Sequence, residues 1–160
     1  MNLKLEGKRA FISGSTQGIG YAVAQQFLNE NAEVIINGRS KEKTASAVQK
    51  LKQEFPNAVV SGIAADFGNK EEINTLLTEI SEIDILVNNV GIFELKSFED
   101  IEDEDWYRIF EINVMSAVRL SKKLLPSMLE KKSGRIIFIS SESGVNIPEN
   151  MIHYGMTKAS

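Results

Sequence analysis

Five short apolar runs divide the chain, and each has the length of a β-strand that is buried on both faces. They lie at residues 9–13, 33–37, 58–64, 84–89 and 135–140. The segments between them have helical spacing, which is clearest where apolar residues fall at i, i+3, i+4 and i+7. Those residues are Ile73, Leu76, Leu77 and Ile80. Because strand and helix alternate, the sequence predicts one α/β domain over residues 1–160, with a parallel sheet and right-handed crossovers.

The segment at residues 106–129 predicts one long helix with two apolar stripes. One stripe contains Trp106, Ile109, Phe110, Ala117 and Leu124, and the other contains Val114, Val118, Leu125 and Met128. A helix that is apolar on two sides is expected to be covered on two sides, with Trp106 anchored in the core. The acidic run at residues 99–105 stands just ahead, where negative charge complements the helix dipole. We interpret that run as a solvated helix start rather than a binding site.

The composition is that of an ordinary globular domain, with 42% apolar residues, 25% charged residues and a formal net charge of −4. The chain has no cysteine and a single histidine, His153. This excludes disulfides, thiol nucleophiles and tetrahedral zinc sites, so the sequence predicts no metal. His153 is expected at the surface or at the rim of a pocket, without a catalytic role.

The sequence also bears on location and on macromolecular partners. No apolar run approaches the roughly 18 residues that span a bilayer, and the first residues lack the features of a signal peptide. No block of Lys and Arg marks a nucleic-acid footprint. We therefore predict a cytoplasmic protein with neither a membrane nor a nucleic-acid partner.

A glycine-rich turn follows the first predicted strand. Its residues are Gly14, Ser15, Thr16, Gln17, Gly18, Ile19 and Gly20. Glycines at such a turn let a diphosphate approach backbone amides at a helix N-terminus. The spacing G-x-x-x-G-x-G is neither the common dinucleotide fingerprint nor a Walker loop. Taken alone, the turn is compatible with a cofactor site and with a purely structural role.

The second predicted strand ends beside Arg39, where a Rossmann-like sheet meets the adenosine ribose of a dinucleotide. An acidic residue there grips a ribose 2′-hydroxyl, whereas an arginine accommodates a 2′-phosphate. Arg39 has no carboxylate beside it in the turn, so NADP(H) is the preferred cofactor and NAD(H) the alternative. A solvated loop arginine without a ligand is the other interpretation.

Tyr154 and Lys158 lie four residues apart at the start of a predicted helix. This spacing puts both side chains on one helix face, where the ammonium favours the ionised phenol. The ordinary pKa of tyrosine, about 10, is too high for proton transfer near neutral pH without such a neighbour. A Tyr-x-x-x-Lys pair also arises by chance, so it gains meaning only from further residues.

Those further residues resemble the short-chain dehydrogenase/reductase family, from Gly7 to the last residue. The turn I-S-G-S-T-Q-G-I-G is similar to the family's cofactor turn, with Ser13 where threonine is usual. Asp66 matches the family's adenine-contacting aspartate. Asn88, Asn89, Val90 and Gly91 resemble its Asn-Asn-Ala-Gly motif, with Val90 in place of alanine. Asn113 and Ser141 correspond to its catalytic asparagine and serine.

The resemblance implies an enzyme that transfers a hydride between a nicotinamide and a carbonyl or alcohol. It implies that Tyr154 moves the proton at the substrate oxygen, which Ser141 hydrogen-bonds. It implies that Lys158 lowers the tyrosine pKa and binds the nicotinamide ribose, while Asn113 holds a water that links Lys158 to solvent. The implied cofactor contacts are the seven turn residues named above with Arg39, Asp66, Phe67, Asn89, Val90, Gly91, Tyr154 and Lys158.

Members of this family continue beyond the position of Ser160. We therefore expect a doubly wound, three-layered, Rossmann-like sheet with five of the family's seven strands, and an exposed apolar edge at residues 135–140. The resemblance also points to a homodimer or homotetramer. Ile92, Phe93, Val145 and Ile147 are expected to line an apolar mouth that fits many ketones. Two functions stay open: an NADP(H)-dependent oxidoreductase, and a non-catalytic nucleotide-binding fragment or interaction module of the same fold.

Overall fold

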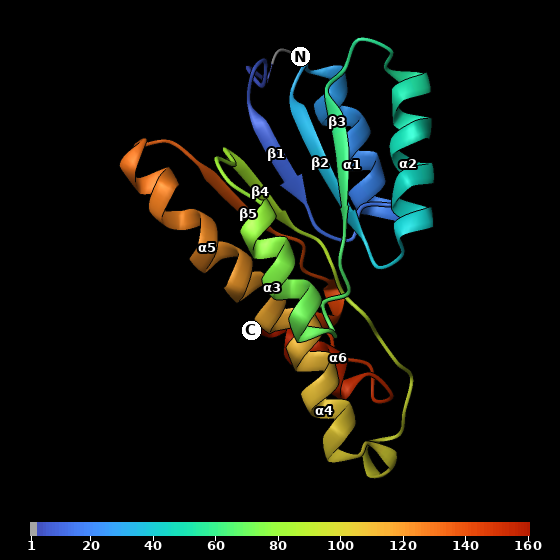
Figure 1. Cartoon of the computed structure of the whole chain (residues 1–160). Helices are drawn as coiled ribbons and strands as arrows, with labels where there is room; N and C mark the ends of the chain where they lie inside the picture. Colours follow the sequence, from blue (N-terminus) through green and yellow to red (C-terminus); the bar gives the residue numbers. More distant parts are fainter. Residues whose placement is uncertain (1–2) are drawn as a thin grey trace.

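The computed structural model describes residues 3–160, which form a five-stranded parallel sheet in the order β3-β2-β1-β4-β5 (Figure 1). The strands are β1 (Arg9–Ile12), β2 (Glu33–Gly38), β3 (Val60–Ala64), β4 (Ile85–Asn88) and β5 (Arg135–Phe138). Phe11 of β1 lies in register with Ile35 of β2 and Leu86 of β4. All five predicted strands are confirmed, with small differences at their ends.

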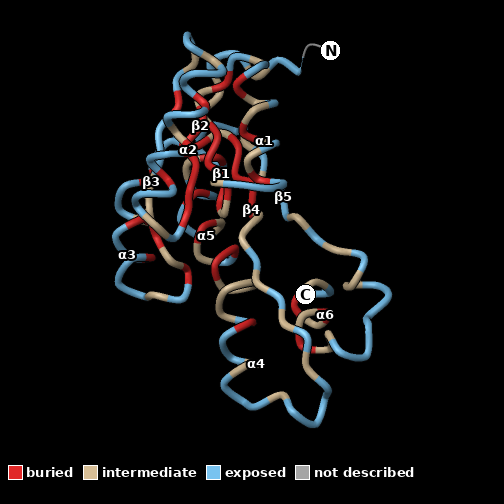
Figure 2. The backbone as a smooth tube through the Cα atoms, turned by 90° about the vertical axis from the view of Figure 1, so that its right-hand side faces the viewer, coloured by how far each residue is buried: buried red, intermediate tan, exposed pale blue. Residues whose placement is uncertain are grey.

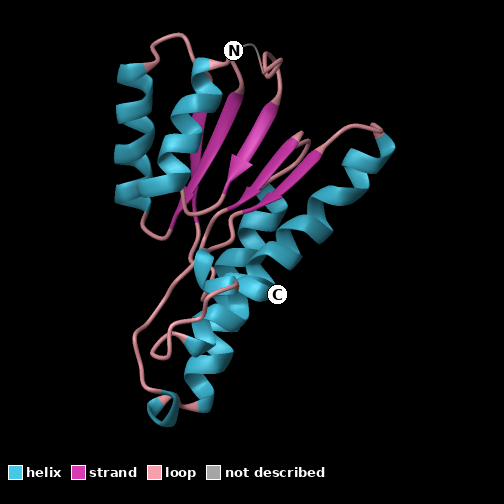
Figure 3. Ribbon diagram, turned by 180° about the vertical axis from the view of Figure 1, so that it is seen from behind, coloured by secondary structure: helices cyan, strands magenta, loops and turns pink. Residues whose placement is uncertain are grey.

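Helices cover both faces of this sheet (Figure 3). One face packs on α1 (Gly18–Asn29) and α2 (Lys41–Glu54), and its core contains Leu28 and Leu51. The other face packs on α3 (Lys70–Glu79) and α5 (Ser116–Glu130), and its core contains Leu76 and Leu120. The predicted three-layered, doubly wound α/β architecture is confirmed.

The predicted long helix begins earlier than expected and is not uniform. It consists of α4 (Asp103–Phe110), a π-helical turn η2 (Glu111–Met115) and α5. The acidic residues 103–105 form the first turn of α4, where the Glu102 amide donates to Asp105 Oδ2 at 3.2 Å. The π-helical turn contains Asn113, whose side chain is hydrogen-bonded to another segment of the chain. Helical periodicity does not predict this local widening, which coincides with a contact to a residue distant in the sequence.

Two apolar residues of this helix, Val118 and Leu125, are 47% and 42% exposed, so its second stripe is only partly covered. The two outer strands are also less buried than the inner ones. Phe138 of β5 is 61% exposed, whereas every residue of β4 is buried. Burial on both faces, predicted for all five strands, holds for the inner strands and is wrong for the two edges. The predicted apolar edge at β5 is confirmed.

The expectation for His153 is wrong. Its side chain is fully buried and packs edge-on against Trp106, with ring centroids 5.9 Å apart. His153 lies on α6 (Ile152–Ala159), which packs against α4, the π-helical turn η2 and the segment at residues 142–147. Trp106 accordingly fills the junction between α4 and α6 and is partly exposed, instead of anchoring the helix in the sheet core.

Beyond the carboxyl ends of the strands, α4, α6 and their connecting loops form a lobe that projects from the sheet (Figure 2). Two short 3-10 helices, η1 (Phe98–Asp100) and η3 (Glu142–Gly144), belong to these loops. Most of the tube in this lobe has the colours of exposed and intermediate residues, whereas buried residues gather in the sheet. Among residues 3–160, no helix is both long and apolar enough to cross a membrane.

Asn37, at the end of β2, ties the carboxyl ends of three strands together. Its Oδ1 accepts from the Gly14 amide at 3.1 Å, and its Nδ2 donates to the carbonyls of Ile63 and Ala65 at 3.1 and 3.3 Å. Its own amide donates to Ser15 Oγ at 2.9 Å. Only 1% of the Asn37 surface is exposed, so these bonds replace the hydrogen bonds that its side chain makes to water in the unfolded chain.

We expect Asn37→Ala to lower the free energy of unfolding by about 2 to 3 kcal/mol, because it leaves a buried amide and two carbonyls without partners. The exposed Asn57 provides the control, and Asn57→Ala should change the free energy by less than about 0.5 kcal/mol. Urea unfolding followed by circular dichroism measures both. Equal midpoints for the two variants would show that the Asn37 network contributes nothing.

Candidate functional site

The glycine-rich turn joins β1 to α1 at the carboxyl edge of the sheet. Gly14 and Gly18 have φ values of 61° and 62°, in the left-handed region that favours glycine. Gly20 is required for a different reason, since a Cβ there would lie 2.5 Å from Asn89 Nδ2. The turn is therefore built to lie directly against the segment that follows β4.

Ser13 and Asn89 fasten that contact. Ser13 Oγ accepts from the amides of Asn89 and Val90, both at 3.0 Å. In return, Asn89 Nδ2 donates to the carbonyls of Ser13 and Gly14 at 3.0 and 2.8 Å. These bonds use the backbone carbonyl and the side-chain hydroxyl of Ser13, both of which threonine also has, so serine in place of threonine retains the whole interaction.

The residues of the turn divide into buried and available ones. Ser15 is buried, and its hydroxyl donates to the Ile12 carbonyl at 2.6 Å. Thr16 packs closely on Gly38, since a Cβ added at Gly38 would lie 2.4 Å from Thr16 Cγ2. Gln17, Gly18 and Ile19 are exposed, and the Gln17 side chain does not cap α1. The first amides of α1 therefore have no side-chain acceptor from the capping position.

The next predicted cofactor residues follow β2 and β3. Arg39 is exposed between Gly38 and Ser40, the residue that caps α2. Asp66 is half-buried, and its Oδ1 accepts from the Gly68 amide at 2.9 Å. The side chain of Phe67 lies in the core beneath α3, so a contact with a cofactor could involve only its backbone.

Asn113 joins three segments of the site. Its Oδ1 accepts from the Ile92 amide at 2.8 Å, while its Nδ2 donates to the Ile92 carbonyl at 2.8 Å. The same Nδ2 donates to Thr157 Oγ1 at 3.0 Å. Thr157 is buried on α6, so Asn113 sets the position of that helix relative to the loop after β4.

Tyr154 and Lys158 share one face of α6, as their spacing predicts. Lys158 Nζ lies 5.8 Å from the centre of the Tyr154 ring and donates to the Ile139 carbonyl at 3.0 Å. A Cβ at Gly91 would lie 3.5 Å from this Nζ and 3.6 Å from Asn113 Oδ1. Burial disfavours the charged ammonium and lowers the pKa of Lys158 from its ordinary 10.5.

Ser141 caps the 3-10 helix η3, and its Oγ accepts from the Ser143 amide at 3.2 Å. Two glycines let η3 lie directly against α6. A Cβ at Gly144 would lie 2.6 Å from the Lys158 carbonyl oxygen, and one at Gly155 would lie 2.8 Å from the Ser143 carbonyl oxygen. Sequence reasoning missed both residues, although a glycine inside a predicted helix is a signal of close packing.

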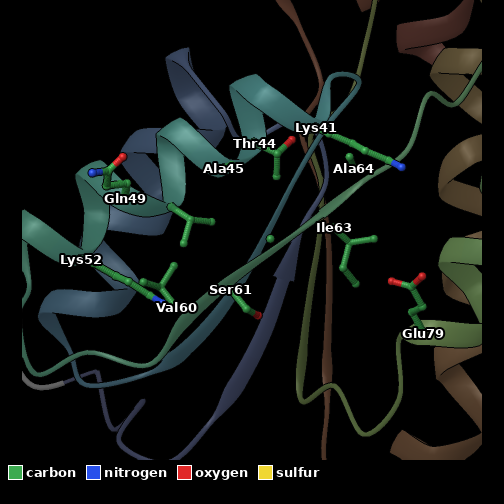
Figure 4. Close-up of a pocket in the computed structure, with 12 residues that line it drawn as sticks. Lys41, Thr44, Ala45, Gln49, Lys52, Val60, Ser61, Ile63, Ala64 and Glu79 are labelled. Atoms are coloured by element: carbon green, nitrogen blue, oxygen red, sulfur yellow. The ribbon is translucent and has the colours of Figure 1, made fainter.

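Two cavities differ in their relation to these residues. A cavity of about 230 Å³ is lined by Asn113, Thr157 and Lys158, and also by Phe138 of β5. A larger groove of about 620 Å³ runs along the outer edge of β3, between Lys41 and Lys52 of α2 and Glu79 of α3 (Figure 4). All predicted site residues lie outside this groove. Within residues 3–160, no group of three or more His, Cys, Asp or Glu could hold a metal ion.

Comparison with known proteins gives consistent similarities. The sequence model of a family described as short chain dehydrogenase matches residues 8–160. An uncharacterized oxidoreductase of Bacillus subtilis (strain 168), YvaG, is 48% identical over 158 residues, which are 99% of this chain and 60% of that protein.

Solved structures agree with the sequence comparison. L-sorbose reductase from Gluconobacter frateurii, complexed with NADPH and L-sorbose, has a TM-score of 0.93 and 32% identity over 99% of this chain and 62% of that one. A bulky-bulky ketone specific alcohol dehydrogenase from Comamonas testosteroni has a TM-score of 0.88 and 25% identity over 99% of this chain and 63% of that one. The chain thus spans about 60% of the length of the curated relative.

We expect Lys158 to titrate at a lower pH than lysines on the surface, because its pKa is lowered by burial. The unfolded chain then binds more protons between the two pKa values, so this group makes the free energy of unfolding rise with pH in that window. The pH dependence of the Lys158 13Cε chemical shift, assigned with Lys158→Met, measures the titration. The exposed Lys122 provides the reference. Identical midpoints for the two lysines would contradict the expectation.

Proposed function

Because the chain belongs to the short chain dehydrogenase family, we propose that it binds NADP(H) and transfers a hydride between the nicotinamide and a carbonyl or alcohol. The observation that carries the proposal is that Lys158 Nζ and Asn113 Oδ1 both lie next to Gly91. A Cβ at Gly91 would be 3.5 Å from the Lys158 nitrogen and 3.6 Å from the Asn113 oxygen. Tyr154 lies on the same face of α6 as Lys158. The residues that we propose for proton transfer therefore lie near Gly91, a backbone position without a side chain just after β4.

The residues present fit a dinucleotide. The uncapped start of α1, with Gly18 and Gly20, offers backbone amides to a diphosphate, while Gly14, with φ 61°, forms the turn that precedes it. Asp66, which follows β3, would contact the adenine as the family resemblance implies, and Gly91 has no side chain beside Lys158. When bound, the cofactor supplies or accepts the hydride.

The chain itself handles the proton. In the reducing direction, the Tyr154 phenol donates a proton to the carbonyl oxygen, and in the oxidising direction it takes one from the alcohol. The Ser141 hydroxyl donates a hydrogen bond to the same oxygen as negative charge develops on it. Lys158 Nζ, 5.8 Å from the ring centre, lies on the same face of α6, where it would also contact the nicotinamide ribose as the family resemblance implies.

Asn113 acts as a positioning residue in this proposal, through its bonds to Ile92 and Thr157. The water that the family resemblance assigns to Asn113 stays a prediction. The second function predicted from the sequence also stays open.

The proposal includes association and location. The partly exposed stripe of α5, with Val118 and Leu125, supports self-association as a homodimer or homotetramer. A cytoplasmic location and the absence of nucleic-acid partners remain predictions from the sequence. L-sorbose, the substrate named for one structural neighbour, and bulky ketones, named for another, are two candidates within the carbonyl class.

Arg39→Ala tests the choice of cofactor. A charge-assisted contact with the 2′-phosphate is worth about 1.5 to 3 kcal/mol, so the variant should lose roughly 10- to 150-fold in NADPH affinity and little in NADH affinity. Titrations at fixed salt measure both constants, with Arg135→Ala at the opposite end of the sheet as the control. Equal losses for NADPH and NADH would remove the selection role from Arg39.

Tyr154→Phe tests the chemistry by removing only a hydroxyl. Cofactor affinity should stay nearly unchanged, while turnover of a carbonyl substrate should fall by a factor of at least about 10². Tyr107→Phe, on the exposed face of α4, should leave turnover intact. Turnover that survives in Tyr154→Phe would refute the assignment. A wild-type chain that binds NADPH but turns over no carbonyl compound would favour the non-catalytic alternative.

A further inference from the structure

Phe93 is an exposed aromatic residue directly beside the proposed proton donor. Its ring meets the Tyr154 ring edge-on, with centroids 6.1 Å apart and planes inclined at 63°. Although it makes this contact, 63% of Phe93 is exposed. The preceding residue, Ile92, is held through both backbone groups by Asn113. The structure thus presents a fixed apolar ring to solvent next to the Tyr154 ring.

A second group of exposed apolar side chains lies in the loop before α6, next to the residue that follows Tyr154. Ile147 packs on Gly155, the residue after Tyr154, since a Cβ at Gly155 would lie 2.5 Å from Ile147 Cγ2. Ile147 is 46% exposed, and Val145 in the same loop is 85% exposed. The Lys96 amide donates to the Asn150 carbonyl at 2.9 Å, which ties this loop to the loop of Phe93.

The charged residues of the loop that contains Phe93 form ion pairs with α4. Glu94 pairs with Arg108 at 2.5 Å, and Lys96 pairs with Asp105. In the opposite loop, the charged residues are the exposed Glu142 and Glu149. The exposed carboxylates disfavour anionic substrates, while the exposed side chains near Tyr154, those of Phe93 and Ile147, are apolar.

We propose that Phe93 determines specificity, and that with Ile147 it selects neutral carbonyl compounds bearing an apolar substituent, best an aryl group, over polyhydroxylated ones. An aryl group stacked on Phe93 gains an aromatic contact and removes the exposed ring from water, whereas a polyol loses hydrogen bonds to water that these apolar side chains cannot replace. This inference rests on the proposed function, because Tyr154 defines where the carbonyl lies.

Binding constants test the inference without requiring turnover. Propiophenone and L-sorbose are titrated by calorimetry into the full chain in the presence of NADP+. We expect propiophenone to bind the wild-type chain at least about 10-fold more tightly than L-sorbose, and Phe93→Ala to weaken propiophenone binding about 5- to 20-fold without affecting L-sorbose. Phe93→Leu should keep more of the affinity than Phe93→Ala, since it retains apolar area.

Leu95→Ala is the matched control, because Leu95 is 62% exposed in the same loop. It should leave both constants unchanged. Unchanged propiophenone affinity in Phe93→Ala, equal losses in Phe93→Ala and Leu95→Ala, or failure of the wild-type chain to bind propiophenone would each overturn the assignment. Failure of the proposed function has a different signature, because the wild-type chain would then not bind NADPH in a separate titration.

Discussion

A single side-chain amide, that of Asn113, sets the geometry on which the site depends. It is bonded to both backbone groups of Ile92 and to the hydroxyl of Thr157. Ile92 carries Phe93 into place, and Thr157 shares α6 with Tyr154 and Lys158. The π-helical turn that contains Asn113 is the local distortion at which this contact is made, and such turns commonly occur at functional positions.

A second constraint acts at the carboxyl ends of the inner strands, where buried polar groups satisfy one another. Ser13 and Asn89 form hydrogen bonds that join the end of β1 to the end of β4. Asn37 forms hydrogen bonds that join the ends of β1, β2 and β3. Capping side chains engage the starts of α2 and α3, whereas none caps the start of α1. The backbone donors left available at this edge are therefore concentrated at the glycine turn, where an anion is favoured.

Periodicity and motif spacing predicted the strands, the two helical layers and the shared face of Tyr154 and Lys158, because these depend on local pattern. They did not predict the burial of His153, which follows from docking of α6 on Trp106. The same limit explains the missed Gly144 and Gly155, whose importance appears only when η3 meets α6. The sequence predicts Asn37 only as the end of a strand. The residues next to it in the sequence do not reveal its bonds to Gly14 and Ile63, which are 23 and 26 positions away.

A half-buried lysine on α6 and exposed apolar side chains lie close together, an arrangement that suits the proposed proton transfer to an apolar substrate. Lys158 is partly removed from water, and this weakens the screening between its ammonium and the nearby phenol. On the open side, Phe93 and Ile147 remain in contact with solvent. A substrate with an apolar group over these side chains displaces that water and lowers the local dielectric further. In the proposed reaction, binding such a substrate would therefore also strengthen the interaction between Lys158 and the reacting oxygen, whereas a hydrated polyol would leave water at the site.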